Sequence, residues 1–353
     1  MTEYTVVDGD AHYLEKLPEL AEYMDDDNPW KRRFQESPDK LLPSGGVPDH
    51  YLYGRIQRDE VGYLDGDMTP EDVPVAMDHV GVDKVIVISH KMLSFSRFKA
   101  DDERAVLLAN TYADYVLDQI VDPDEGIYAL VVAPYQEPEK AAELVDCVGD
   151  EEGIVGVCMI SGGPEPPFGN RKYDPIYRAA SDADLPLVFH AGGSSLDHFY
   201  LKGYEKVVES HTLGFLWNNM AQLVSVVIQG IPEKFPDLDL VFQESGVLYV
   251  PSLMARLDAE YLKRPSEVPI LEQRPSKYMR EFYYGTQPMD HPDDVEYFEQ
   301  AIAEMGGASQ LMYASDYPHW DYDPPSAITN IPFFSDEEKS AILGGNAEEV
   351  FGI

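Results

Sequence analysis

Residues 154–160 read IVGVCMI, a run of apolar and small residues without polar alternation. Such a run is typical of a strand that is buried on both faces, as in a parallel sheet covered by helices. Other short β-rich runs recur along the chain, separated by stretches of helical character. The predicted strands are Tyr4–Val7, Lys84–Ser89, Ile127–Val132, Ile154–Ile160, Leu187–His190, Leu238–Phe242, Glu281–Gly285 and Gln310–Ala314.

Helical stretches between these strands complete the alternation. Thr69-Pro70-Glu71 supplies a cap residue, a first-turn proline and an acid, which predicts a helix running toward His79. Asp101–Val121 begins with acids and continues with apolar residues at helical spacing, and an apolar stripe over 213–228 ends before Gly230. Repeated β/α alternation predicts a (β/α)8 TIM barrel. The alternative, a doubly wound sheet, is disfavoured because no glycine-rich phosphate loop follows an early strand.

Residues 13–68 interrupt the alternation with a long connection rich in Pro, Gly, Asp and Tyr. Connections of this length inside a compact domain are usually functional covers or disordered segments. We therefore expect a single domain over residues 1–353, with an insert at 13–68 after the first strand. The insert's aromatic residues predict a packed cover over the barrel mouth: Tyr23, Trp30, Phe34, Tyr51, Tyr53 and Tyr63.

The chain carries 65 acidic and 26 basic residues, a net charge of −39, with the acids scattered along its whole length. This charge excludes nucleic acid and anionic membranes as expected partners. A solvated acidic shell is suited to molar salt, where the Debye length falls to about 3 Å. The composition therefore predicts a protein from a salt-accumulating halophile.

The two cysteines, Cys147 and Cys158, do not predict a structural disulfide. Cys158 lies in an apolar run and is expected to be buried, which fits a reducing cytoplasm. The N-terminal sequence MTEYTVVDGD lacks the basic and apolar regions of a signal peptide. No apolar run approaches the roughly 18 residues of a membrane span. A cytoplasmic location is the expectation.

Polar side chains follow four of the predicted strands, where the active site of such a barrel gathers. Strand one leads into Asp10 and His12, strand five ends at His190, strand six at Glu244 and strand eight at Asp316. Asp10 and His12 are two residues apart, so on a strand they point to the same face. Imidazole and carboxylate ligands around an open position suit one divalent ion, Zn²⁺ or Mn²⁺. Such an ion would lower the pKa of bound water or polarise a substrate oxygen.

Five segments together resemble the amidohydrolase-2 family, which includes aminocarboxymuconate-semialdehyde decarboxylase and γ-resorcylate decarboxylase. They are VVDGDAHYLE (6–15), PLVFHAGG (186–193), GIPEKFPDLDLVFQESGVLYVPSLMARLDAEY (230–261), LMYASDYPHWD (311–321) and GNAEEVFG (345–352). By this likeness Asp10 and His12 match the strand-one ligand pair, and His190 and Asp316 the ligands of strands five and eight. The resemblance implies a metal-dependent TIM-barrel hydrolase or decarboxylase, and a possible homodimer.

Two departures from the family pattern bear on the reaction. The family's strand-one pair is commonly His-x-His or Glu-x-His, and Asp10 with His12 retains a carboxylate ligand. Where well-known decarboxylases carry a catalytic histidine after strand six, this chain has Glu244. A glutamate donates a proton only if its environment keeps it neutral, so the particular reaction stays open. Strand four lacks the lysine that bridges two metals in binuclear relatives, which favours one metal.

Each candidate also has a purely structural interpretation. Asp10 and Asp316 suit turns, His190 suits a buried core position, and Glu244 suits a carboxylate that orients its neighbours. His211, at the start of the long helix before strand six, is a further catalytic candidate, and His319 is a candidate for substrate contact or for supporting a ligand. No constellation supports the remaining histidines, and Arg256 is expected to pair with Asp258 or another acid. These histidines are His50, His79, His90, His198 and His291.

The leading hypothesis is a metal-dependent decarboxylase or hydrolase acting on a small carboxylated, cyclic or unsaturated substrate. In a decarboxylase, the acid that protonates the product carbon would be Glu244 or Asp316. In a hydrolase, Asp316 would take the proton of an activated water. The alternative is a catalytically inactive barrel that binds a ligand or a partner.

Overall fold

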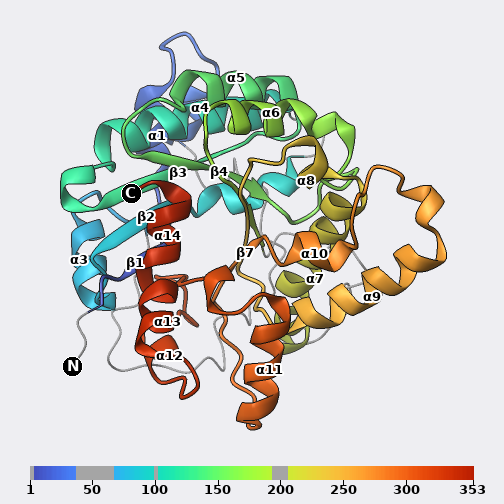
Figure 1. The fold of residues 1–353 in the computed structure, drawn as a ribbon. Coiled ribbons are helices and arrows are strands. Elements are labelled where there is room, and N and C mark those ends of the chain that lie inside the picture. Colours follow the sequence, from blue (N-terminus) through green and yellow to red (C-terminus); the bar gives the residue numbers. More distant parts are fainter. Residues whose placement is uncertain (1–3, 37–66, 99–101, 193–205) are drawn as a thin grey trace.

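The computed structural model describes residues 4–36, 67–98, 102–192 and 206–353. Eight parallel strands pair in the order of the sequence, with helices around their outside (Figure 1). This arrangement confirms the (β/α)8 TIM barrel. The strands are β1 (Val7–Tyr13), β2 (Lys84–Ser89), β3 (Ile127–Val132), β4 (Ile154–Ile160), β5 (Leu187–His190), β6 (Leu240–Gln243), β7 (Tyr283–Gly285) and β8 (Leu311–Met312).

Backbone hydrogen bonds join β1 to the segment that follows β8, and so bring the two ends of the sheet together. The N–H of Gly9 donates to the carbonyl of Tyr313 at 3.0 Å, and the N–H of Asp316 donates to that of Asp10 at 2.8 Å. The N–H of His12 donates to the carbonyl of Tyr317 at 2.8 Å. Three of the predicted metal ligands therefore lie on this seam.

The helices follow the pattern of β/α units, with short extra helices in the connections. Their order and bounds are α1 (Leu17–Leu20), α2 (Lys31–Glu36), α3 (Asp72–Val80), α4 (Asp102–Gln119), α5 (Pro138–Val148), α6 (Asp174–Asp182), α7 (Val207–Ile228), α8 (Ile231–Lys234), α9 (Tyr249–Lys263), α10 (Pro275–Met279), α11 (Val295–Met305), α12 (Ser326–Thr329), α13 (Asp336–Ser340) and α14 (Asn346–Phe351). Short turns of 3₁₀ helix include η1 (Ala21–Tyr23) and η4 (Lys91–Arg97).

The helix predicted to run from Thr69 toward His79 is α3, but it begins at Asp72, later than the predicted cap at Thr69. Its N-cap residue is Glu71, whose side chain makes no capping bond, and the Thr69 N–H donates to the Asp72 carboxylate at 2.7 Å. Gly81 ends the helix at φ 84°, a left-handed conformation that glycine adopts without steric cost.

The strands are buried on both faces, as the apolar runs predicted. Every residue of β4 is buried. On the neighbouring strands, the rings of Phe189 and Phe242 stack with centroids 4.8 Å apart and an interplanar angle of 19°. Full burial of such a side chain contributes about 2 kcal/mol, so these rings stabilise the barrel core.

The first strand lies later in the sequence than predicted. Tyr4–Val7 was the expected strand, but β1 runs from Val7 to Tyr13. The polar residues Asp8, Asp10 and His12 remain in the strand because its backbone pairs with β2 on one side and with the segment after β8 on the other. Tertiary pairing thus overrides the low strand propensity of the local sequence.

The described part of the insert packs against α4. The phenyl ring of Phe34 is fully buried, and the Tyr23 hydroxyl donates to Asp118 on α4 at 2.5 Å. The guanidinium of Arg104, also on α4, lies 5.0 Å from the centroid of the Trp30 ring. Residues 37–66, which carry Tyr51, Tyr53 and Tyr63, lie outside the described residues. The single-domain organisation and the cover over the barrel mouth therefore stay predictions.

Both cysteines are free thiols, with Cys158 buried in β4 and Cys147 exposed on α5, as expected. Within the described ranges, no helix combines the length and the apolar character needed to cross a bilayer.

Candidate active site

The four predicted metal ligands converge, although they come from three distant parts of the chain. The Nε2 atom of His190 lies 3.0 Å from Oδ1 of Asp10. The Nε2 atom of His12 lies 3.5 Å from Asp10 Oδ1 and 3.0 Å from Asp316 Oδ1. Ligands bound to one ion at about 2.1 Å are separated by distances of this size. All four side chains are buried.

The orientation of His190 requires a positive charge between its ring and Asp10. Its Nδ1 atom lies 2.5 Å from the carbonyl oxygen of Ala191, so Nδ1 carries the proton that it donates. In the neutral ring, Nε2 then carries a lone pair that faces Oδ1 of the Asp10 carboxylate. Burial lowers the pKa of His190, but the Asp10 carboxylate outweighs this effect and the pKa is raised overall. A divalent cation supplies the required charge in the same place.

His12 provides a second lone pair at the same point. Burial, with the neighbouring His319, lowers the pKa of His12 well below its ordinary value, which keeps its imidazole neutral. Its Nε2 lies within 3.0 Å of Asp316 Oδ1 and still has no hydrogen-bond partner, like the buried Oδ2 of Asp10. Buried polar atoms without partners are rare, and these fit ligands of an ion. Ligand atoms of Asp10, His12 and His190 lie within 4.8 Å of one another, and Asp316 Oδ1 lies 3.0 Å from His12 Nε2. Imidazole and carboxylate donors of this kind fit a single Zn²⁺ or Mn²⁺.

Two of the candidate residues have strained backbone conformations. Asp316 has φ 64° and Glu244 has φ 57°, in the left-handed region that side chains other than glycine rarely adopt. Such strain clusters at functional sites, where surrounding structure holds it in place. It directs both side chains from the ends of β8 and β6 toward the same space.

Asp8 anchors the Asp316 segment to β1. Its carboxylate accepts hydrogen bonds from the backbone N–H of Ser315 at 2.8 Å and from the Ser315 hydroxyl at 2.5 Å. Burial raises the pKa of Asp8 to about 7. Asp8 therefore fixes the position of Asp316 without pointing to the ligand cluster.

His319 and His90 extend the ligand cluster outward. The Nδ1 atom of His319 lies 2.6 Å from Oδ1 of Asp316, and its Nε2 lies 3.0 Å from Nδ1 of His90. The rings of His319 and His12 stack with centroids 4.2 Å apart. The sequence prediction for His319 included support of a ligand. His90 was given no role, although its place directly after β2 is the strand-end signal that identified the other residues.

A cavity of about 340 Å³ opens beside the cluster. It is lined by Glu244, His211, Phe215 and Asp321, among other residues. The Nε2 atom of His211 lies 3.4 Å from Oδ2 of Asp321. Burial, with the negative charge of Asp316, raises the pKa of Asp321 to about 7. His211 thus lies on the cavity wall, and Asp321 is a residue that sequence reasoning missed.

Glu244 stands between this cavity and the ligands. Its Oε2 lies 3.4 Å from Nδ1 of His190 and has no hydrogen-bond partner. Burial and the carboxylates of Asp316, Asp10 and Asp321 raise the pKa of Glu244 well above its ordinary value. The environment that a proton-donating glutamate requires is therefore present.

The other histidines and Arg256 lie apart from the cluster. His79 contacts the ring of Tyr317, and His291 contacts that of Phe298. Arg256 pairs with Glu260 at 3.3 Å on the surface, which agrees with the expected ion pair to an acid. His50 and His198 lie outside the described residues.

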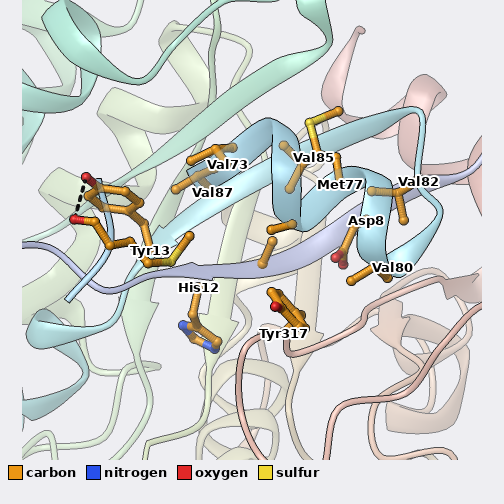
Figure 2. Close-up of a pocket in the computed structure, with 13 residues that line it drawn as sticks. Asp8, His12, Tyr13, Val73, Met77, Val80, Val82, Val85, Val87 and Tyr317 are labelled. Carbon is orange, nitrogen blue, oxygen red and sulfur yellow. Dashed lines mark hydrogen bonds between the residues drawn. The ribbon is translucent and has the colours of Figure 1, made fainter. Parts of the chain in front are cut away.

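A second, apolar cavity of about 20 Å³ lies between β1, β2 and α3. Figure 2 shows that the His12 imidazole projects from β1 away from the apolar side chains of this cavity, such as Val85 and Met77. One face of β1 therefore packs on α3, and the other carries the ligands.

Comparison with known proteins agrees with this geometry. The sequence model of the Amidohydrolase family matches residues 7–353. γ-Resorcylate decarboxylase of Rhizobium sp. is 21% identical over 86% of this chain and 97% of its own length. 2-Amino-3-carboxymuconate-6-semialdehyde decarboxylase of Dictyostelium discoideum is 24% identical over 72% of this chain and 69% of its own length.

The fold is also that of solved decarboxylases. 5-Carboxyvanillate decarboxylase of Novosphingobium aromaticivorans, solved with manganese and 4-hydroxy-3-methoxy-5-nitrobenzoic acid, superposes with a TM-score of 0.71. It is 19% identical, and the match covers 99% of this chain and 96% of that one. With the family model matching nearly its whole length, the chain belongs to the amidohydrolase family and is a metal-dependent enzyme of that family.

Proposed function

We propose that the protein is a carboxy-lyase that removes carbon dioxide from a small carboxylated aromatic or unsaturated substrate, with one divalent ion at Asp10, His12, His190 and Asp316. The observation that carries this proposal is the convergence of unpartnered ligand atoms, His12 Nε2 and Asp10 Oδ2, beside a cavity that holds a raised-pKa glutamate. The decarboxylase relatives support the choice of lyase and of substrate class.

The residues around the cavity are proposed to have different roles in this decarboxylation. A divalent ion held by Asp10, His12, His190 and Asp316 would supply positive charge that stabilises a carboxylated substrate and its transition state. As the bond between the ring carbon and the carboxyl carbon breaks, its electron pair stays on the ring carbon. Glu244 is proposed to give its proton to that carbon, and Asp316 is the other candidate. His190, held by its hydrogen bond to Ala191, stays correctly oriented throughout.

His211 and His319 are assigned supporting roles in this proposal. His211 lies on the cavity wall next to Asp321 and is placed to contact substrate. His319 was expected to contact substrate or to support a ligand, and its hydrogen bond to Asp316 supports the second role.

A hydrolase would use the same ligands with a different division of roles. Asp316 would accept a proton from an attacking water, and Glu244 would only orient its neighbours. Detection of carbon dioxide separates the two reactions. Purified protein loaded with Mn²⁺ or Zn²⁺ is incubated with a panel of hydroxybenzoates and muconate-like acids, and carbon dioxide release is measured. Turnover of esters or amides without carbon dioxide release from any acid would overturn the lyase assignment.

Two variants test the residues. His190→Ala is expected to lose bound metal and turnover together, while Glu244→Gln is expected to keep the metal and lose turnover. Full activity of His190→Ala would defeat the ligand assignment. Protein that never retains a divalent ion would instead support the alternative of an inactive, ligand-binding barrel.

Three broader expectations belong to the same proposal. The free thiols of Cys147 and Cys158 support a cytoplasmic location. A homodimer is proposed from the family likeness and is tested by light scattering. The whole chain is proposed to fold as one domain.

A further inference from the structure

His90 and His319 form a chain of hydrogen bonds that ends on a proposed metal ligand. His90 Nδ1 lies 3.0 Å from His319 Nε2, and His319 Nδ1 lies 2.6 Å from Asp316 Oδ1. Both nitrogen atoms of His319 are thus engaged, one by each neighbour.

The Asp316 carboxylate sets the direction of one of these bonds. A carboxylate oxygen only accepts, so Nδ1 of His319 carries a proton and donates it to Asp316. The bond to His90 forms in either direction: Nε2 of a neutral His319 accepts from Nδ1–H of His90, and Nε2–H of a charged His319 donates to Nδ1 of His90. In both cases the bond holds the side of the His319 ring that faces away from Asp316.

We propose that His90 is a positioning residue: its hydrogen bond fixes the ring orientation of His319, which in turn holds the Asp316 carboxylate for metal binding. The effect on metal affinity rests on the proposed metal site, whereas the orientation of His319 does not.

Asp316 needs such support because its carboxylate has several competing neighbours. Its Oδ1 lies 3.0 Å from His12 Nε2 as well as 2.6 Å from His319 Nδ1, and its backbone is in the left-handed region. The His319 ring is held on its face by stacking on His12, at an interplanar angle of 26°. Stacking restrains the plane of the ring but leaves the ring free to rotate within that plane.

His90 is well placed to prevent that rotation because its own backbone is anchored. It directly follows β2, and its N–H donates to the carbonyl of Tyr13 at the end of β1 at 3.0 Å. The ring meets that of His319 at 68°, with centroids 5.1 Å apart. His90, at the end of β2, therefore supports the proposed metal ligand Asp316, which follows β8 on the other side of β1.

The test uses three substitutions of His90 that differ in where they place a donor. His90→Asn puts an amide near the position of Nδ1, His90→Gln puts it farther out, and His90→Leu removes it. His291→Leu, at an exposed histidine away from the cluster, is the control. The dissociation constant for Mn²⁺ or Zn²⁺ is measured by competition with a chelator.

Loss of a partner that orients a metal ligand typically weakens metal binding by 10–100-fold. We expect His90→Leu to raise the dissociation constant by at least about tenfold, His90→Gln to behave similarly, and His90→Asn to restore most of the affinity. His291→Leu should leave it unchanged. Melting temperatures of the metal-free variants show whether any loss of affinity reflects loss of fold.

Nitrogen NMR of the metal-free protein gives a second readout. The His319 Nε2 resonance reports the hydrogen bond to His90, so it should shift in His90→Leu, and His90→Asn should reverse most of that shift. Wild-type metal affinity in His90→Leu, or an unchanged His319 Nε2 resonance in that variant, would overturn the proposal. If the wild type binds no metal, an unchanged resonance counts against both this proposal and the metal site, and a shifted resonance counts against the metal site alone.

Discussion

Glu15 offers a direct measure of how strongly this barrel penalises a buried carboxylate. Its side chain is fully buried after β1, where one oxygen accepts from the Ser89 hydroxyl and from the N–H of Lys91, the latter at 3.1 Å. The other oxygen has no hydrogen-bond partner. Burial raises the pKa of Glu15 from its ordinary 4.5 to about 7.

The sign of the pH dependence follows from proton binding. Between pH 4.5 and about 7 the folded protein keeps a proton on Glu15 that the unfolded chain has lost, so the free energy of unfolding falls as pH rises. At 1.36 kcal/mol per pH unit, this loss reaches about 3 kcal/mol above pH 7. Glu15→Gln removes the titration and should remove this part of the pH dependence.

Urea unfolding of the wild type and of Glu15→Gln between pH 4.5 and 8, at constant high salt, measures the difference. Across this pH range, the difference between the two free energies of unfolding should change by about 3 kcal/mol, and Glu15→Gln should gain stability relative to the wild type as the pH rises. Glu139→Gln, on the first turn of α5, controls for the loss of one negative charge. Parallel curves for the wild type and Glu15→Gln would refute the reasoning.

Three further predictions concern the site and the surface. Asp316→Asn keeps a residue that tolerates the left-handed backbone but removes the negative charge, so the affinity for the metal should fall at least about tenfold. Because repulsion between carboxylates in the cluster is reduced, the metal-free variant should melt at a higher temperature than the wild type at pH 8. A lower melting temperature would contradict this repulsion. Because the pKa of Asp321 is about 7, Asp321→Asn should remove an inflection near pH 7 from the profile of kcat/KM, and an unchanged profile would exclude Asp321 from the reaction. With a net charge of −39, the protein should melt at least about 4 °C lower in 0.1 M than in 3 M KCl, and equal melting temperatures would remove the halophile inference.

The barrel and the convergence of the candidate ligands could be predicted from sequence because buried parallel strands leave a local signature. Continuous apolar runs marked the strands, and the polar residue after each run marked the mouth of the barrel. Asp10, His12, His190 and Asp316 were found in this way, and the structure brings them together.

What was missed depends on contacts between distant segments. β1 continues to Tyr13, past the expected end at Val7, because pairing with the segment after β8 keeps Asp8 and Asp10 in the strand. Asp321 belongs to the site only because the chain after β8 folds back to His211. His90 directly follows a predicted strand, which is the local signal that identified the other site residues. Its hydrogen-bond partner, His319, is distant in sequence and is brought to it only by the closure of the barrel, so the sequence did not reveal the pair.

Because the barrel closes at the proposed metal site, metal binding should affect the stability of that closure. The amides that join the first strand to the segment after the last belong to Gly9, His12 and Asp316, and two of these residues, His12 and Asp316, belong to the proposed metal site. A cation bound there would hold the two ends of the barrel together. Chelation should therefore speed hydrogen exchange first at those amides, with the remaining strands still protected.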